Sequence, residues 1–304
     1  MKETQSSYKS KKEIYFWVVV FIIFIAFLIF SSNANRIGQN TFNAERAFKD
    51  LSYQLTLGPR TPGTAGHAAV ISWVSSELPK YGWQVEIQKG SIGDQKVENI
   101  IAKKGTGSRW IIIGAHYDTR QFADQDPDVA RQTQPVPGAS DGASGVAVLM
   151  ELARVLPVQK DTEIWLVFFD TEDQGRIDQK DWIVGSRYFA SQLTRLPSAV
   201  VILDMIGDKN LEVFQEMNSD KNLTNEIWNI AASLGYKDHF NSATKHSMLD
   251  DHTPFIEKGI PAVDIIDFDY PYWHTTSDNM ENVSAESLKV IGDTILEWII
   301  TKPF

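Results

Sequence analysis

Acidic and histidine side chains follow four apolar runs of the sequence, at the points where buried strands would end. His116 and Asp118 follow the first run, and Asp204 follows the third. The chain has no cysteine, so a bound metal can use only histidine nitrogens and carboxylate oxygens. Because clustered carboxylates repel one another unless a cation neutralises them, this set predicts a zinc site with an open position. The candidate residues are His116, Asp118, Asp141, Asp170, Glu172, Asp173, Asp204 and His274.

Glu172 and Asp173 are neighbours directly after the second apolar run. Neighbouring side chains of an extended segment point in opposite directions, so one of the two can bind a metal while the other faces a substrate. A carboxylate that stands beside zinc without binding it can move protons to and from a water or an amine. The pair therefore predicts one metal ligand and one general acid or base.

Some of the polar residues also have simpler interpretations. Asp141, taken alone, could cap the helix that follows it. We expect Asp118 to orient His116 through a ring N–H rather than to touch the metal. We expect His252 to begin a helix and to support Asp251 or the backbone. Helix capping alone does not explain why acids and histidines from separate segments meet at one edge of the predicted sheet.

The apolar runs themselves are typical of strands buried on both faces of a sheet. Segments with helical periodicity alternate with them, and the helix expected over residues 143–156 is apolar all round, as a buried crossover would be. This alternation predicts a three-layer α/β domain around a mixed, mostly parallel sheet, with its site at the carboxyl ends of the strands. The expected strands are 110–118, 163–170, 199–207 and 262–267, with an early hairpin at 83–87 and 99–104; the expected helices are 66–81, 143–156, 185–194, 221–235 and 284–301.

The N-terminal segment predicts a membrane anchor rather than part of this domain. Residues 14–30 form an unbroken apolar run, and lysines stand before it at positions 9, 11 and 12. A helix of this length spans about 26 Å, close to the thickness of a bilayer. Because lysines mark the cytoplasmic side, we expect a cytoplasmic tail at 1–13, a transmembrane signal anchor at 14–32 and an extracytoplasmic catalytic domain at 33–304. If the anchor is instead a cleaved signal peptide, the domain is secreted.

The composition after this segment is that of an ordinary globular domain. Over the whole chain, 43% of the residues are hydrophobic and 22% are charged. The formal net charge is −10 at pH 7, which argues against nucleic acid as the main partner because phosphate binding needs a basic surface. No repeat or low-complexity tract divides the chain after residue 40, so we expect one domain.

Five motifs stand in order along the chain: GAHYDTR (114–120), GASDGASGVAVLMELARVL (138–156), FFDTEDQG (168–175), LDMIG (203–207) and WHTTSD (273–278). This series resembles the zinc metallopeptidase family M28, the clan MH aminopeptidases. The stretch RTPGTAGH (60–67) is similar to that family's N-terminal signature. The resemblance implies a phosphorylase/hydrolase-like zinc exopeptidase fold. By analogy with the aminopeptidases, which bind two zinc ions, Glu172 would be the general base and the ligands would be His116, Asp141, Asp173, Asp204 and His274.

Two further segments, LDDHTPFIEKGIP (249–261) and FDYPYWHT (268–275), resemble the glutaminyl-peptide cyclotransferases of the same superfamily. Those enzymes hold one zinc ion. The resemblance implies that Glu172 would shuttle a proton, while Asp204 and Asp250 would hydrogen-bond near the substrate amine. Most relatives have a glutamate at the position of Asp173, so this ligand is one methylene shorter here. The single zinc would be held by Asp141, Asp173 and His274.

The resemblance predicts a zinc-dependent enzyme that acts on the N-termini of peptides or proteins. We expect a glutaminyl cyclase, which cyclises N-terminal glutamine to pyroglutamate and releases ammonia; the alternative is a zinc aminopeptidase that hydrolyses the first peptide bond. A remote alternative is a membrane-anchored binding module with a vestigial site. We expect Tyr272, Trp273 and Asp250 to contact the substrate. Trp182 is the candidate for a tryptophan that the cyclases carry after the acidic pair.

Overall fold

The structure is a computed structural model that describes residue 17, residues 41–157 and residues 161–301. The predicted cytoplasmic tail, and the predicted signal anchor apart from Trp17, lie outside the described residues, as does the expected domain start at residue 33. Among the residues that are described, no helix is both long and apolar enough to cross a membrane. The described residues from Phe42 onward belong to one compact unit, to which the following account applies.

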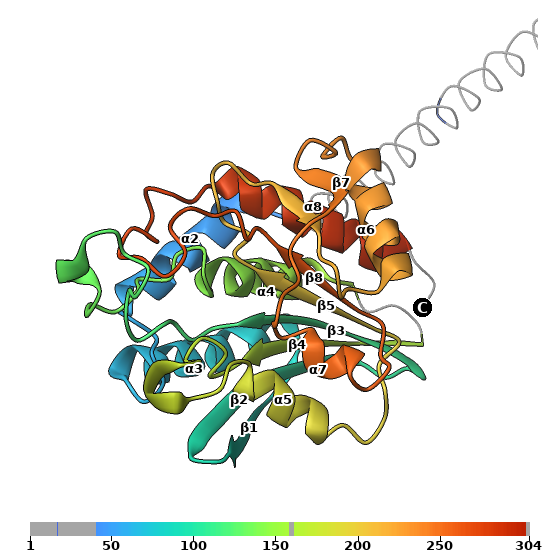
Figure 1. The fold of residues 1–304 in the computed structure, drawn as a ribbon. Coiled ribbons are helices and arrows are strands. Elements are labelled where there is room, and N and C mark those ends of the chain that lie inside the picture. The colour runs from blue at the N-terminus through green and yellow to red at the C-terminus, as the bar shows by residue number, and fades with distance from the viewer. Residues whose placement is uncertain (1–16, 18–40, 158–160, 302–304) are drawn as a thin grey trace, which may run out of the picture. The chain divides into compact units, whose positions relative to one another are not determined.

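Six strands form the central sheet, in the spatial order β1 (Gln84–Ile92), β2 (Gln95–Gly105), β4 (Thr162–Phe169), β3 (Arg109–His116), β5 (Ala199–Asp204) and β8 (Ala262–Ile266) (Figure 1). The β4, β3, β5 and β8 strands are parallel, whereas β2 pairs antiparallel with both β4 and β1. The sheet is therefore mixed and mostly parallel, and the early hairpin is present, as predicted. Because β4 and β5 lie on opposite sides of β3, the strand order reverses at β3, where ligands bind in such sheets.

Helices cover both faces of this sheet and complete the three predicted layers (Figure 1). Side chains alternate along each strand: Ile111 and Ile113 join the larger core cluster, and Ile112 joins the smaller one on the other face. The larger cluster includes residues of α2 (Ala44–Thr56), α3 (Ala65–Glu77), α4 (Ala143–Val155), α6 (Lys221–Ser233) and α8 (Ala285–Thr301). The smaller cluster includes residues of α5 (Val184–Ser191) and α7 (Thr253–Ile256).

Helix α4 is the buried crossover that the sequence predicts. Every residue of α4 except Arg154 is buried. A Cβ atom added at Gly145 would lie 2.4 Å from the carbonyl oxygen of Leu203, so only glycine allows α4 to pack this close to β5. The helix begins immediately after Asp141 and Gly142, and its packing therefore fixes where Asp141 stands.

The fold also contains elements that the apolar pattern did not predict. A separate two-stranded parallel sheet consists of β6 (Val213–Gln215) and β7 (Phe240–Thr244), and helix α2 precedes the predicted helices. The strand β6 is too short to show a period, and β7 is largely exposed. Three short 3₁₀ helices complete the elements: η1 (Leu78–Tyr81), η2 (Val129–Arg131) and η3 (Ile177–Gln179).

Candidate metal centre

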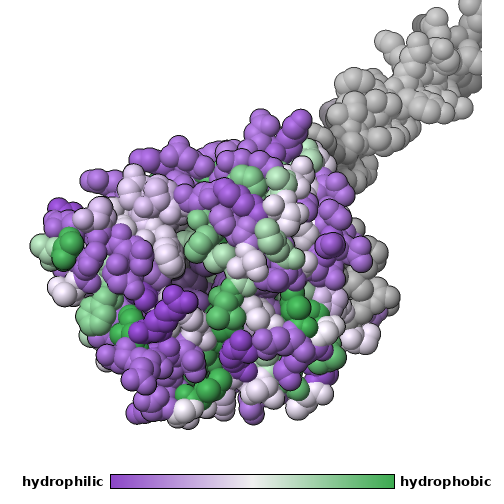
Figure 2. Space-filling view, viewed as in Figure 1, coloured by the Kyte–Doolittle hydropathy of each residue, from purple (hydrophilic) through white to green (hydrophobic). Residues whose placement is uncertain are grey.

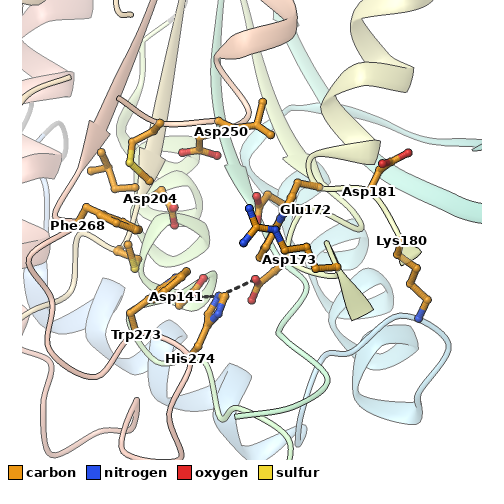
Figure 3. Close-up of a pocket in the computed structure, with 16 residues that line it drawn as sticks. Asp141, Glu172, Asp173, Lys180, Asp181, Asp204, Asp250, Phe268, Trp273 and His274 are labelled. Atoms are coloured by element: carbon orange, nitrogen blue, oxygen red, sulfur yellow. Dashed lines mark ion pairs between the residues drawn. The ribbon is translucent and has the colours of Figure 1, made fainter. Parts of the chain in front are cut away.

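The predicted acids and histidines meet at the carboxyl edge of the parallel strands. His116 is the last residue of β3, and Asp204 is the last residue of β5. The two strand ends are level because Gly114 of β3 pairs with Ile202 of β5. Figure 3 shows side chains from the ends of these elements and from the following loops pointing into one pocket. Those labelled include Asp141, Glu172, Asp173, Asp204, Asp250 and His274.

Asp141 stands between the two histidines. One of its oxygens, Oδ1, lies 3.0 Å from His116 Nε2, and the other lies 3.7 Å from His274 Nε2. Asp204 Oδ1 lies 3.1 Å from His116 Nε2, and Asp173 Oδ1 lies 2.9 Å from His274 Nε2. The result is two groups of three residues that share Asp141, and within each group the potential ligand atoms lie within 4.8 Å of one another.

The environment of Asp173 shows that this arrangement fits a cation. The side chain is 1% exposed, and among the described residues neither of its oxygens accepts a hydrogen bond of acceptable geometry. A buried carboxylate that accepts no hydrogen bond is unfavourable unless a positive charge compensates it. Histidine nitrogens and carboxylate oxygens with no thiolate are a ligand set that suits zinc.

The pKa shifts of Asp173, Asp204 and His274 also indicate that this site favours a bound positive charge. Burial raises the pKa of Asp173 to about 6 and that of Asp204 to about 7, against the attraction of the histidines. Burial by itself would lower the pKa of His274, but the neighbouring Asp173 and Asp124 raise it to about 9. Burial therefore disfavours the ionised carboxylates unless positive charge lies close to them.

Asp118 fixes the turn that carries the acidic pair. Its Oδ1 accepts the backbone N–H of Glu172 at 2.9 Å, and its Oδ2 accepts that of Asp173 at 3.2 Å. Asp118 Oδ1 lies 3.6 Å from His116 Nδ1, which is longer than a normal hydrogen bond. The structure therefore gives Asp118 a backbone role in addition to the predicted proximity to His116. Thr171, just before the pair, has a left-handed backbone with φ of 54°.

Asp170 belongs to the support of the site rather than to the two ligand groups. Its Oδ1 lies 2.8 Å from His67 Nε2, and its Oδ2 accepts the backbone N–H of Glu98 at 2.8 Å. His67 is buried, and the hydroxyl of Tyr117 lies 3.1 Å from its Nε2. These contacts hold the chain just before Glu172.

Two further aspartates, which the sequence did not predict as site residues, position candidate ligands. Asp124 Oδ1 lies 3.3 Å from His274 Nδ1, the nitrogen opposite the one that faces Asp173. Asp278 accepts the backbone N–H groups of Ser140 at 2.7 Å and of Asp141 at 3.1 Å. His274 has a left-handed backbone with φ of 54°, and the residue after Asp204, Met205, has φ of 46°.

Arg60 explains the N-terminal motif RTPGTAGH. Its buried guanidinium donates to the carbonyl of Gly138 at 2.5 Å, of Pro137 at 3.1 Å and of Tyr117 at 3.1 Å. These bonds tie the loop that precedes Asp141 to the end of β3. The motif resembled a family signature in the sequence, but only the fold shows which backbone groups it holds.

A pocket of about 370 Å³ lies in front of the two ligand groups. Trp273 stacks on the His274 ring at 3.8 Å between centroids, and Trp182 stacks on it at 6.0 Å. Both tryptophans line the pocket, and so does Asp250. Tyr272 is not among the lining residues and instead packs against Tyr270. The face around the pocket is mostly hydrophilic, with scattered hydrophobic residues (Figure 2).

Behind Asp250 lies a buried polar group that involves His252. His252 directly precedes α7, as predicted, but its side chain makes no capping hydrogen bond, and its ring faces Glu216 at 3.3 Å and Asp264 at 3.7 Å. Burial raises the pKa of Asp264 well above its usual range, and nearby Asp250 raises it further. The sequence predicts that His252 supports Asp251 or the backbone; in the structure its ring lies instead beside Glu216 and Asp264, beneath the pocket.

The fold and site define a class of enzyme, the zinc-dependent exopeptidases and their relatives. A zinc-dependent exopeptidase from Parabacteroides distasonis is 33% identical to this chain, with a TM-score of 0.81, and the match covers 87% of this chain and 100% of that one. A glutaminyl cyclase from Porphyromonas gingivalis is 36% identical, with a TM-score of 0.81, and covers 86% of this chain and 99% of its own. The glutaminyl-peptide cyclotransferase of Gloydius blomhoffii is 27% identical over 318 residues, which is 88% of this chain and 82% of that protein.

The sequence matches the model of Peptidase family M28 over residues 99–299, and the chain belongs to that family. The predicted family is thereby confirmed, and the protein is an enzyme of this family. The family and its zinc-dependent relatives imply zinc as the cofactor and the N-termini of peptides as substrates.

The contact between Asp124 and His274 gives a first prediction. We expect Asp124→Ala to weaken zinc binding about 10- to 100-fold, because the carboxylate that orients a metal-binding histidine contributes about this much. Competition with a chelator of known affinity measures the change. Asp128→Ala, which removes an exposed aspartate of the same loop, is the control. Equal zinc affinity in the two variants would show that Asp124 does not position His274.

Proposed function

We propose that the protein is a glutaminyl-peptide cyclotransferase. The observation that carries the proposal is the aromatic pocket, in which Trp182 and Trp273 stack beside His274 and face the acids of the candidate metal centre. Such a pocket suits a single planar side chain such as the carboxamide of glutamine. The 36% identity with a bacterial glutaminyl cyclase along nearly the whole domain supports the same assignment.

In the proposed reaction, zinc would be held by Asp141, Asp173 and His274, and when bound it polarises a carbonyl as a Lewis acid. The α-amine nitrogen of the N-terminal glutamine forms a bond to the Cδ carbon of its own side chain, and the bond from Cδ to the carboxamide nitrogen breaks. Glu172 accepts a proton from the attacking amine and delivers it to the departing nitrogen, which leaves as ammonia.

Other residues of the pocket hold the amine during this reaction. Asp204 and Asp250 both line the pocket, so either carboxylate can accept a hydrogen bond from the amine. The tryptophans keep the glutamine side chain in the folded shape that brings its two ends together. The chain thus supplies orientation and proton transfer.

A second function, zinc aminopeptidase, is favoured by one specific observation. The potential ligand atoms of His116, Asp141 and Asp204 also lie within 4.8 Å of one another, so the site offers a place for a second ion. In the aminopeptidase reaction, Asp204 would bind the metal instead of accepting a hydrogen bond from the substrate amine, and Glu172 takes a proton from water. The water oxygen then attacks the first peptide bond, and Glu172 returns the proton to the leaving amine.

Zinc counting combined with two substrates separates the two functions. We expect the purified protein to bind one zinc ion tightly and to convert a peptide that begins with glutamine into its pyroglutamyl form, with release of ammonia. We expect little free leucine from a peptide that begins with leucine. Mass spectrometry measures both products, and elemental analysis counts the zinc. A protein that releases leucine and makes no pyroglutamate would be an aminopeptidase instead.

We also propose that the catalytic domain, residues 33–304, acts outside the cytoplasm. The support is the apolar run with its preceding lysines, which is typical of a signal anchor at residues 14–32 after a short tail at 1–13. Cleavage of that segment would release the same domain as a secreted enzyme.

A further inference from the structure

Two cations stand at the mouth of the pocket on one short stretch, residues 174–182, here called the mouth segment. Arg176 and Lys180 both line the pocket. The remaining charged lining residues are acidic, apart from His274. Within the described part of the chain, neither cationic side chain forms an ion pair or a hydrogen bond. In Figure 3, Lys180 lies at the edge of the pocket opposite Phe268 and Trp273.

The backbone of the mouth segment is fixed from several sides. The guanidinium of Arg120 donates to the carbonyl of Gly175 at 3.1 Å and lies 4.7 Å from the centre of the Trp182 ring. A Cβ atom added at Gly175 would lie 2.1 Å from that ring, so the segment packs tightly on its own tryptophan. Gln95 exchanges two hydrogen bonds with the backbone of Asp181, at 2.7 and 3.1 Å. The backbone that carries Arg176 and Lys180 is therefore held in place beside the pocket.

The conformation of the mouth segment is also strained. Arg176, Asp178 and Gln179 have left-handed backbones, with φ of 65°, 50° and 63°. The backbone N–H of Arg176 donates to the carbonyl of Lys180 at 2.8 Å, which closes the turn and holds both cations at its two ends. Strain of this kind persists where the surrounding structure enforces it and is concentrated at functional sites.

We propose that Arg176 and Lys180 bind a carboxylate of the substrate, carried by the side chain of its second or third residue. This inference rests on the proposed function, because it requires the N-terminal residue to occupy the pocket. An extended peptide advances about 3.5 Å per residue, so the residues after the first pass over the pocket mouth. The deep acids attract the amine of the first residue, and the cations at the mouth attract the acidic residue that follows it.

The charge of the protein makes this local arrangement informative. The chain has a formal net charge of −10, which repels acidic peptides at long range. Asp181 adds one more negative charge to the mouth, but it forms no ion pair with either cation among the described residues. A preference for acidic peptides would therefore have to come from Arg176 and Lys180.

The test compares kcat/KM for three tripeptides with amidated C-termini, Gln-Glu-Ala, Gln-Gln-Ala and Gln-Lys-Ala. We expect the order Glu over Gln over Lys, with about three- to tenfold between the first two at low salt, as two solvent-exposed ion pairs provide. The preference should fall at high salt. In the double variant Arg176→Gln and Lys180→Gln, the ratio of Glu peptide to Gln peptide should fall to about one. Lys258→Gln, an exposed lysine that does not line the pocket, is the control and should keep the ratio.

Two further measurements distinguish the possible reasons for a negative result. Gln-Gln-Ala with a free C-terminus tests whether the terminal carboxylate, rather than an acidic side chain, is the group that is bound. A matching series that begins with leucine measures the same ratio if the enzyme proves to be an aminopeptidase, so a wrong reaction does not hide the answer. Equal kcat/KM for the Glu and Gln peptides, or an unchanged ratio in the double variant, would overturn the proposal.

Discussion

Glu172→Gln is expected to keep zinc bound and to lower kcat by about 10²- to 10⁴-fold, the usual contribution of a general acid–base group. Glu172 lines the pocket but belongs to neither of the two ligand groups, so the metal does not depend on it. Burial raises the pKa of Glu172 well above its usual range, and nearby acids raise it further. A carboxyl in that state can hold a proton near neutral pH and give it up again. Glutamine has the same shape but cannot exchange the proton.

Turnover and zinc content must be measured on the same preparation. Glu257→Gln, which removes an exposed glutamate that pairs with Arg187, is the matched control and should leave both quantities unchanged. If Glu172→Gln loses its zinc, then Glu172 is a ligand rather than a proton carrier. If the variant keeps more than about a tenth of the kcat, the assigned proton transfer is wrong.

Asp173→Asn should abolish zinc binding and lower kcat/KM by at least about 10³-fold, since the metal both positions and polarises the substrate. The same change should stabilise the zinc-free protein at pH 8, by about 3 kcal/mol. The folded pKa of Asp173 is about 6 and its ordinary value is 3.8. Because the folded value is raised, ionising this side chain favours the unfolded chain. Below pH 4 the Asp173 side chain is protonated in both the folded and the unfolded chain and does not change the free energy of unfolding. As the pH rises through 6, its ionisation lowers that free energy, and asparagine avoids the loss because it cannot ionise.

Thermal unfolding of the zinc-stripped proteins between pH 4 and pH 8 tests this sign. The melting temperature of Asp173→Asn should exceed that of the unmodified protein by about 6 to 12 °C at pH 8, and the difference should vanish near pH 4. Asp94→Asn, at an exposed aspartate of the β1–β2 turn, should show no such pH dependence. A melting temperature that falls at pH 8 would mean that the ion pair with His274 outweighs the burial of Asp173.

The sequence predicts the sheet and the meeting of the ligands because both follow from the apolar runs. Each run ends at a polar residue, as with His116 and Asp204, and parallel strands bring their carboxyl ends to one edge. Helix α2 could have been predicted from its N-cap residue, because Asn43 caps it by accepting the backbone N–H of Arg46. The short strand β6 left no usable signal, since three residues show no period.

The supporting residues of the site could not be predicted in the same way. Asp278 bonds to the backbone of Ser140, 138 positions away, and no local pattern records such a contact. Tyr272 and Trp273 are adjacent in an irregular loop, where no period says which of the two faces the pocket. The resemblance to known enzymes predicted the ligands, but only the fold shows that Arg60 holds the loop before Asp141 and that Asp124 contacts His274.

The left-handed residues beside the ligands set a limit on how this enzyme can be improved. Thr171 and Met205 each hold a backbone shape that costs about 1 to 3 kcal/mol. Glycine at either position would relax the chain, and directed evolution for heat resistance alone would favour such changes. The relaxed loops would then let the ligands drift, so a library selected without an activity screen would lose catalysis at these positions first.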